Sequence, residues 1–342
     1  MNAPAKPSAL LAKDFASDQE VRWCPGCGDY AILKGVQKTL ADIGTAPENV
    51  VFVSGIGCSS RFPYYMSTYG FHTIHGRAPA FATGIKLANP QLDVWLVTGD
   101  GDGLSIGGNH LLHVLRRNVN MQILLFNNEI YGLTKGQYSP TSKQGLRSPS
   151  TPMGSLDRPL SPALFALGAN ATFVARAVDT QQKHMPGVLL RAHAHQGASF
   201  VEIYTNCIVY NDGAFASFAE KNTAAEGELV LEQGAPMIFG KDRDKGIRLK
   251  RDTLSLEVVQ LGVNGITEDD LLRHDETNRV LAGLLAEMRN PDFPVAVGVL
   301  YCKAAPAYDT AVHEQIAAAR SAKGAADINK LLRGGATWTV GD

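Results

Sequence analysis

Two polar segments of the sequence carry residue types that can bind a phosphorylated ligand through a divalent metal ion. The first is GDGDG at residues 99–103, which directly follows the apolar run 94–98. Glycines at the end of a strand let backbone amides approach a phosphate, and a helix N-terminus beyond them favours negative charge. An aspartate beside a phosphate needs a cation between the two anions. A bridging Mg²⁺, bound by carboxylate and amide oxygens, supplies that cation.

The second segment is Asn127-Asn128, which ends the next apolar run, 121–126. Asn128 follows Asp100 by 128 − 100 = 28 positions. Because open α/β sheets bind ligands at the carboxyl ends of their strands, we expect the two segments to meet there. The sequence has no GxxxxGK[ST] of a nucleotide P-loop. It also lacks the acidic residue that a dinucleotide fold places about 20 positions further on. Taken singly, each segment is also compatible with an ordinary turn or loop cap.

The five cysteines predict a second, inorganic centre. Cys24 and Cys27 lie in the turn CPGCG, Cys58 follows 58 − 27 = 31 residues later, and Cys207 ends another predicted strand. An odd number of cysteines in a long chain does not indicate a disulfide framework. Four thiolates suit either zinc or a [4Fe–4S] cluster, and their dispersal along the chain favours the cluster. Cys302 lies in an apolar strand and is predicted to be an ordinary buried thiol.

The elements that must position these residues alternate between helices and short buried strands. Helical spacing of apolar residues predicts helices over 29–43, 77–89, 110–117, 161–167 and 181–195. Apolar runs predict strands over 50–54, 94–98, 121–126, 171–175 and 200–205. This alternation predicts an α/β fold, with a mostly parallel sheet covered by helices on both faces.

Composition limits the classes of partner. Lys plus Arg is 32 and Asp plus Glu is 33, and this net charge of −1 removes the main electrostatic argument for nucleic-acid or anionic-membrane binding. No apolar run approaches the ~20 residues of a membrane span, and we find no secretory signal, so a cytoplasmic protein is expected. The change in texture predicts an N-terminal arm (1–20), a cofactor domain (21–229) and a C-terminal extension (230–342). This extension, with a helix near 269–288 and a strand over 295–300, is expected to pack on the core or on a partner chain.

GDG followed some 28 residues later by NN resembles the motif of thiamine-diphosphate enzymes. In that family the first aspartate, the second asparagine and the carbonyl two residues further on hold Mg²⁺. Carried over, the ligands are Asp100, Asn128 and Ile130. Asp102 is a weaker rival for the metal and is expected to contact the cofactor instead.

The ordered motifs CPGCGDY, GIGCSSR, HTIHGRAPAFATGIKLANP, GDGDGLSIGGNH and NNEIYGLTKGQ, together with Cys207, closely resemble the β subunit of 2-oxoacid:ferredoxin oxidoreductases. The resemblance spans roughly residues 20–230 and is greatest to the 2-oxoglutarate type. It implies a thiamine-diphosphate-binding fold with thiamine diphosphate, Mg²⁺ and one [4Fe–4S] cluster. The implied cluster ligands are Cys24, Cys27, Cys58 and Cys207. The implied cofactor contacts are Ile56, Gly57, Cys58, Ser59, His75, Gly101, Asp102, Gly132 and Leu133.

The resemblance also implies an activity, the oxidative decarboxylation of a 2-oxo acid with coenzyme A, with electrons passing through the cluster to ferredoxin. His75 is expected near the thiazolium and the substrate carboxylate. Arg61 and Lys135 are expected to bind a distal carboxylate, which favours 2-oxoglutarate over pyruvate and succinyl-coenzyme A as product.

We find no separate pyrimidine-binding domain in the sequence. In the family the glutamate that contacts the pyrimidine ring comes from an α subunit, and a dimer of αβ heterodimers is expected. Two alternatives stay open. One is a pyruvate or broad-range enzyme of the same family, and the other is a non-catalytic, zinc-stabilised, thiamine-diphosphate-binding assembly subunit.

Overall fold

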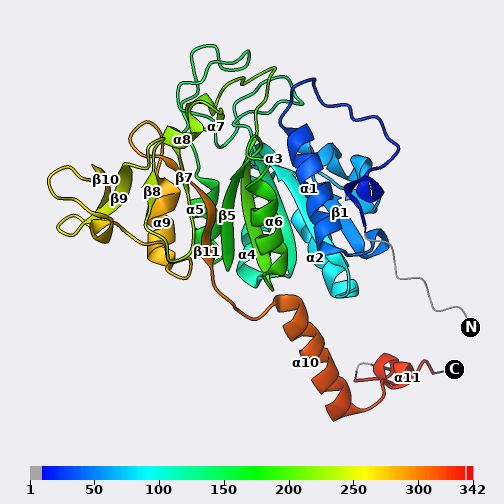
Figure 1. The fold of residues 1–342 in the computed structure, drawn as a ribbon. Helices are drawn as coiled ribbons and strands as arrows, with labels where there is room; N and C mark the ends of the chain where they lie inside the picture. The colour runs from blue at the N-terminus through cyan, green and yellow to red at the C-terminus, as the bar shows by residue number, and fades with distance from the viewer. Residues whose placement is uncertain (1–9, 336, 342) are drawn as a thin grey trace, which may run out of the picture.

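The computed structural model describes residues 10–335 and 337–341, and an eight-stranded sheet lies at its centre (Figure 1). Neighbouring strands are parallel, except that β11 runs antiparallel to β5. In spatial order the strands are β2 (Tyr69–His72), β1 (Val50–Ser54), β3 (Asp93–Gly99), β4 (Met121–Asn127), β6 (Ala198–Tyr204), β5 (Phe173–Val178), β11 (Val295–Cys302) and β7 (Glu228–Val230). The predicted α/β fold with a mostly parallel sheet is confirmed.

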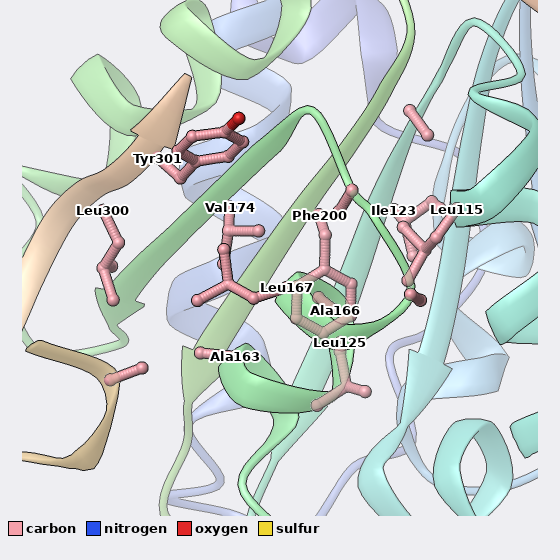
Figure 2. Close-up of a cluster of buried hydrophobic side chains, with 14 of the residues drawn as sticks. Leu115, Ile123, Leu125, Ala163, Ala166, Leu167, Val174, Phe200, Leu300 and Tyr301 are labelled. Carbon is pink, nitrogen blue, oxygen red and sulfur yellow. The ribbon is translucent and has the colours of Figure 1, made fainter. Parts of the chain in front are cut away.

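Helices cover both faces of this sheet because successive strand residues point to opposite faces. Val51 and Val53 belong to one core cluster, whereas Val50 and Phe52 belong to the other. On one face pack α1 (Asp29–Ile43) and α6 (Met185–Ala194). On the other pack α2 (Ala78–Ala88), α4 (Gly108–Arg117), α5 (Pro162–Gly168) and α9 (Arg279–Glu287). Figure 2 shows part of this second cluster, where Phe200 and Val174 meet side chains of α5.

Local signals explain where several elements begin and end. α1 and β1 have the predicted bounds, and α1 stops at Gly44, whose φ of 78° suits glycine. The helix predicted near 269–288 is shorter than expected. Its polar first half forms a 3-10 turn over Glu268–Asp270, and α9 begins only after Asn278, whose side chain accepts from the amides of Val280 and Leu281. The Asn278 cap therefore sets the helix start.

The C-terminal third of the chain is divided between the main body and two outlying parts. β11 lies inside the main sheet and α9 inside its core, so a division at residue 229 cuts through one packed unit. The antiparallel strands β8 (Ile238–Phe239), β9 (Lys245–Lys250) and β10 (Ser255–Gln260) form a separate small sheet. The helices α10 (Tyr308–Lys323) and α11 (Ile328–Leu332) project away from the main sheet (Figure 1).

Three short helices complete the fold. They are α3 (Asp100–Leu104), α7 (Ala216–Ala219) and α8 (Ala224–Gly227). Within residues 10–335 and 337–341, no helix has both the length and the apolar character needed to cross a membrane. Residues 1–9 of the expected N-terminal arm lie outside the described residues.

Candidate active site

A cavity lies at the carboxyl end of β3 and β4 and gathers residues from four separate segments. Asp100 follows β3, Asn128 and Ile130 follow β4, and both segments line the cavity. All nine residues expected to contact the cofactor also line it: Ile56, Gly57, Cys58, Ser59, His75, Gly101, Asp102, Gly132 and Leu133. The fold therefore brings the GDGDG segment and the Asn-Asn segment to one place, as parallel strands predict.

Asp100 is buried and held by two hydroxyl groups. Ser139 Oγ and Thr141 Oγ1 both donate to its Oδ2, at 2.5 and 2.6 Å. Burial raises the pKa of Asp100 to about 6, while the two hydroxyl donors act against this rise. A buried carboxylate with a raised pKa is stabilised by a nearby cation, which restores the charged form. This electrostatic environment, and the use of only one carboxylate oxygen by both hydroxyls, fit a ligand of Mg²⁺.

The turn after β4 presents the other two expected ligands. Glu129 has a φ of 54° and lies between Asn128 and Ile130. Its amide donates to Asn127 Oδ1 at 3.2 Å, and the amide of Ile130 donates to Asn128 Oδ1 at 3.2 Å. Carboxylate, amide and carbonyl oxygens around one cavity form a donor set that Mg²⁺ prefers. These residues therefore fit a magnesium ion that bridges to a diphosphate.

Asp102 has a different role from Asp100, because the protein itself occupies its oxygens. The amides of Ile56 and Gly76 donate to its Oδ1 at 3.1 and 2.7 Å, and Thr98 Oγ1 donates to its Oδ2 at 2.6 Å. Nδ1 of His75 lies 2.7 Å from the same Oδ1. Asp102 thereby joins the loop after β1 to the turn that carries His75. These contacts weigh against Asp102 as the metal ligand.

Four residues of the site were missed in the sequence. Ser139, Thr141 and Tyr131 follow β4, and Tyr131 packs on Gly101 so closely that a Cβ there would lie 2.2 Å from its ring. Tyr131 also donates its hydroxyl to the Gly101 carbonyl at 3.0 Å. Asp29 lines the cavity too, with its pKa raised to about 7 by burial. No spacing pattern links the hydroxyls to Asp100, and only the polarity of the YSPTS segment hints at them.

The structure also brings the CPGC turn to the end of β6, about 180 residues away. The amide of Gly28 donates to the Asn206 carbonyl at 3.2 Å, and Ile208 fills the space beside Gly26. Cys58 reaches the same corner, where its carbonyl accepts from Trp23 Nε1 at 2.7 Å. Segments that carry all four cysteines singled out in the sequence therefore meet at one corner beside the cavity.

Gly132 lies between two of these thiols. A Cβ at this position would stand 3.5 Å from the Sγ atoms of both Cys58 and Cys207. The two sulfurs are therefore at most 3.5 + 3.5 = 7.0 Å apart. Burial raises the pKa of Cys58 to about 12, and the neighbouring Asp29 carboxylate and thiols add to this rise. Burial also raises the pKa of Cys27. Such thiols need a positive centre to become thiolates.

Among the residues that the structure describes, no three His, Cys, Asp or Glu side chains are close enough to hold a single metal ion. A cluster spreads its thiolate ligands over several irons. The open space at Gly132 and the wider separation of the thiols fit such a polynuclear group.

The two expected substrate cations lie outside the cavity lining. Arg61 follows Cys58 in a 3-10 helix, Ser59–Tyr65, and its turn carries the side chain away from the loop that faces the cavity. The Nε atom of Arg61 is buried without a hydrogen-bond partner. Its charge still acts on Cys58, because it opposes the rise in that thiol's pKa. Lys135 is exposed and has a φ of 79°.

The surface around the cavity is unusually apolar. Phe71, Ile74, Phe81, Ile106 and Leu133 are between 47 % and 69 % exposed. β2 lies at the edge of the sheet and all four of its residues are exposed. Exposed apolar patches and open sheet edges of this kind are typical of protein interfaces. Within the described part of the chain, no glutamate lines the cavity.

Comparison with known proteins agrees with this geometry. Residues 55–203 match the family described as thiamine pyrophosphate enzyme, C-terminal TPP binding domain. The chain is 50 % identical over 98 % of its length to the 2-oxoglutarate oxidoreductase subunit KorB of Mycobacterium tuberculosis, 90 % of which is covered. It is 46 % identical, over 57 % of its length and 62 % of the relative, to the β subunit of 2-oxoacid:ferredoxin oxidoreductase 1 of Aeropyrum pernix.

A solved structure gives the same result over nearly the whole chain. The 2-oxoglutarate:ferredoxin oxidoreductase of Magnetococcus marinus, with 2-oxoglutarate, coenzyme A and succinyl-CoA bound, superposes with a TM-score of 0.75 at 34 % identity. The match covers 96 % of this chain and 97 % of the other. Fold and site thus define a thiamine-diphosphate-binding protein. Within this class, the chain belongs to the β subunits of the 2-oxoacid:ferredoxin oxidoreductases.

Proposed function

We propose that this chain is the β subunit of a 2-oxoglutarate:ferredoxin oxidoreductase. The enzyme converts 2-oxoglutarate and coenzyme A to succinyl-coenzyme A and carbon dioxide, and passes two electrons to ferredoxin. The observation that carries the choice of substrate is the 50 % identity to a 2-oxoglutarate oxidoreductase subunit over 98 % of the chain. The match to a structure with 2-oxoglutarate and succinyl-CoA bound supports the same choice.

The residues of the cavity would bind and orient the cofactors. Asp100, Asn128 and the carbonyl of Ile130 would hold Mg²⁺, and the Asp102 contact would hold His75 over the cavity. When bound, thiamine diphosphate supplies the carbanion chemistry of decarboxylation and a [4Fe–4S] cluster supplies one-electron redox chemistry.

Cys24, Cys27, Cys58 and Cys207 would hold the cluster. Cys58 lines the cavity and also flanks Gly132 opposite Cys207, so one loop would serve both cofactors. Such thiols must stay reduced, which supports a cytoplasmic location.

A β subunit implies an α subunit, and the site supports a specific role for it. The cavity lining of the described residues lacks a glutamate, and the apolar side chains around the cavity are exposed. We propose that the α subunit covers this surface and contributes the pyrimidine-side glutamate, in a dimer of αβ heterodimers.

Anaerobic co-purification of the two subunits tests the proposal. The complex should contain about four irons per β chain, and it should reduce ferredoxin or viologen with 2-oxoglutarate and coenzyme A. A panel of 2-oxo acids distinguishes the alternatives, because preference for pyruvate would overturn the substrate assignment. A colourless complex that contains zinc, with no 2-oxoacid-dependent reduction, would overturn the redox function altogether.

A further inference from the structure

A buried ion pair lies beneath the candidate metal site and touches none of its expected ligands. Arg176 on β5 and Glu202 on β6 are 3 % and 0 % exposed. Arg176 Nε donates to Glu202 Oε2 at 2.8 Å, and Arg176 Nη2 donates to the Ala286 carbonyl at 3.1 Å. The guanidinium also lies over the Tyr204 ring, 5.9 Å from its centroid. Both charges are therefore held firmly inside the sheet.

Stability alone does not account for this pair. Removing two charges from water costs several kcal/mol per ion, and well-packed apolar residues often replace a buried pair with no loss of stability. Nη1 of Arg176 is also buried without a hydrogen-bond partner, which adds to the cost. The pair therefore requires an explanation in what it holds.

The second oxygen of Glu202 gives that explanation. Oε1 accepts from Nδ2 of Asn127 at 2.8 Å. Because a carboxylate only accepts, it fixes which end of the Asn127 amide faces it. Oδ1 of Asn127 must then point the other way, where it accepts from the Glu129 amide at 3.2 Å and lies 3.0 Å from Thr141 Oγ1.

These two contacts reach both halves of the candidate metal site. Glu129 has the left-handed backbone, at φ 54°, that separates Asn128 from Ile130, so its amide contact sets the course of that turn. Thr141 donates to Asp100 Oδ2 at 2.6 Å. The polarity of one asparagine amide is thus matched to the positions of all three expected magnesium ligands.

Sheet register makes the arrangement rigid. Arg176 and Glu202 are directly paired across β5 and β6, and Glu202 is paired with Leu125 on β4. Asn127 lies two residues beyond Leu125 and therefore on the same face of the sheet. Three adjacent strands hold the three side chains in a row.

We propose that Glu202, aligned by Arg176, is a positioning residue that sets the Asn127 amide and, through it, the magnesium-binding turn at residues 128–130. This inference rests on the proposed function, because it takes Asp100, Asn128 and Ile130 as the ligands of Mg²⁺. Partners that orient metal ligands in this way change metal affinity by about 10- to 100-fold when they are altered.

The test measures binding by the αβ complex freed of its cofactors. Dissociation constants for thiamine diphosphate and for Mg²⁺ are obtained by calorimetry or tryptophan fluorescence. Glu202→Gln places an amide against both Arg176 and Asn127, so the asparagine amide must turn over or lose a partner. We expect Mg²⁺ affinity to fall by about 10- to 100-fold. The matched control is Glu228→Gln, the same change at a buried glutamate on β7 in the same sheet, and it should leave both constants unchanged.

A polarity exchange separates positioning from packing. In the double variant Asn127→Asp with Glu202→Gln, the new amide can donate to the new carboxylate, which still accepts from the Glu129 amide. We expect this double variant to recover most of the lost Mg²⁺ affinity, although Asn127→Asp alone sets two carboxylates against each other. Failure of the double variant to recover any affinity would overturn the proposal.

Folding is controlled with a variant that removes the charges together. Arg176→Met with Glu202→Leu replaces the ion pair by apolar groups, so its thermal unfolding should stay near that of the unmodified complex. We expect it to bind Mg²⁺ as weakly as Glu202→Gln, and full Mg²⁺ affinity in this variant would overturn the proposal. Asp100→Ala is measured beside it. If Asp100→Ala binds the cofactor normally, the proposed function fails. If only Asp100→Ala loses binding, the function stands and the positioning role fails.

Discussion

Replacing Gly132 by alanine tests the cluster site without removing any thiol. A Cβ at this position would stand 3.5 Å from the Sγ atoms of both Cys58 and Cys207. In the protein without a cluster this is ordinary van der Waals contact, so the fold and the thiols should be unaffected. The methyl group nevertheless lies in the space that a group bonded to both sulfurs must share.

The magnitude follows from that geometry. Metal–thiolate bonds are about 2.3 Å long, so metal atoms bonded to both sulfurs would lie well inside the contact distance of the new carbon. Forcing an extra carbon into a filled site costs about 1–3 kcal/mol. At 1.4 kcal/mol per tenfold change, this cost corresponds to about a 5- to 140-fold loss of cluster affinity.

The assay is iron and sulfide analysis of the anaerobically purified complex, with visible absorption as a second measure. Gly283→Ala is the control, because nothing lies within 4 Å of a Cβ at that helical position. We expect Gly132→Ala to lose most of its iron with an unchanged unfolding temperature, and the control to keep its iron. Normal iron content in Gly132→Ala would show that the cluster does not lie between Cys58 and Cys207.

Three further predictions concern ligands, substrate and pH. Cys207→Ser should lose the cluster by iron analysis while Cys302→Ser keeps it, and equal iron in both would remove Cys207 from the ligand set. Arg61→Ala should lower kcat/KM for 2-oxoglutarate by about ten- to a hundredfold, the value of one charge-assisted hydrogen bond, and leave small 2-oxo acids nearly unchanged. An equal fall for both substrates would assign Arg61 a structural role. Burial raises the pKa of Glu228 to about 7 from 4.5, so the folded chain binds that proton more tightly than the unfolded chain. The free energy of unfolding should therefore be highest below pH 4.5 and fall by about 3 kcal/mol as the pH rises past 7. Glu228→Gln should remove that part of the decline in denaturant titrations, and an unaltered pH profile would contradict the assignment.

The sequence by itself determined the features that depend on local pattern. The spacing of Ile32, Val36 and Leu40 predicted α1, and the run of apolar residues at 50–54 predicted β1. Periodicity is a local property, so it survives without knowledge of the fold. The sequence also predicted that Asp100 and Asn128 meet at one cavity, because parallel strands must end on the same edge.

Only the tertiary structure decided which partners surround those residues. Nothing in the spacing of Ser139, Thr141 and Asp100 shows that the hydroxyls return to the carboxylate across about 40 residues. The placement of β11 within the main sheet depends on pairing with β5, more than 100 residues earlier. Contacts between distant segments depend on the packing of the whole chain, and a single sequence carries no local signal for them. The pairing of Arg176 with Glu202 beneath the metal site is of this kind, because strand order alone brings their side chains together.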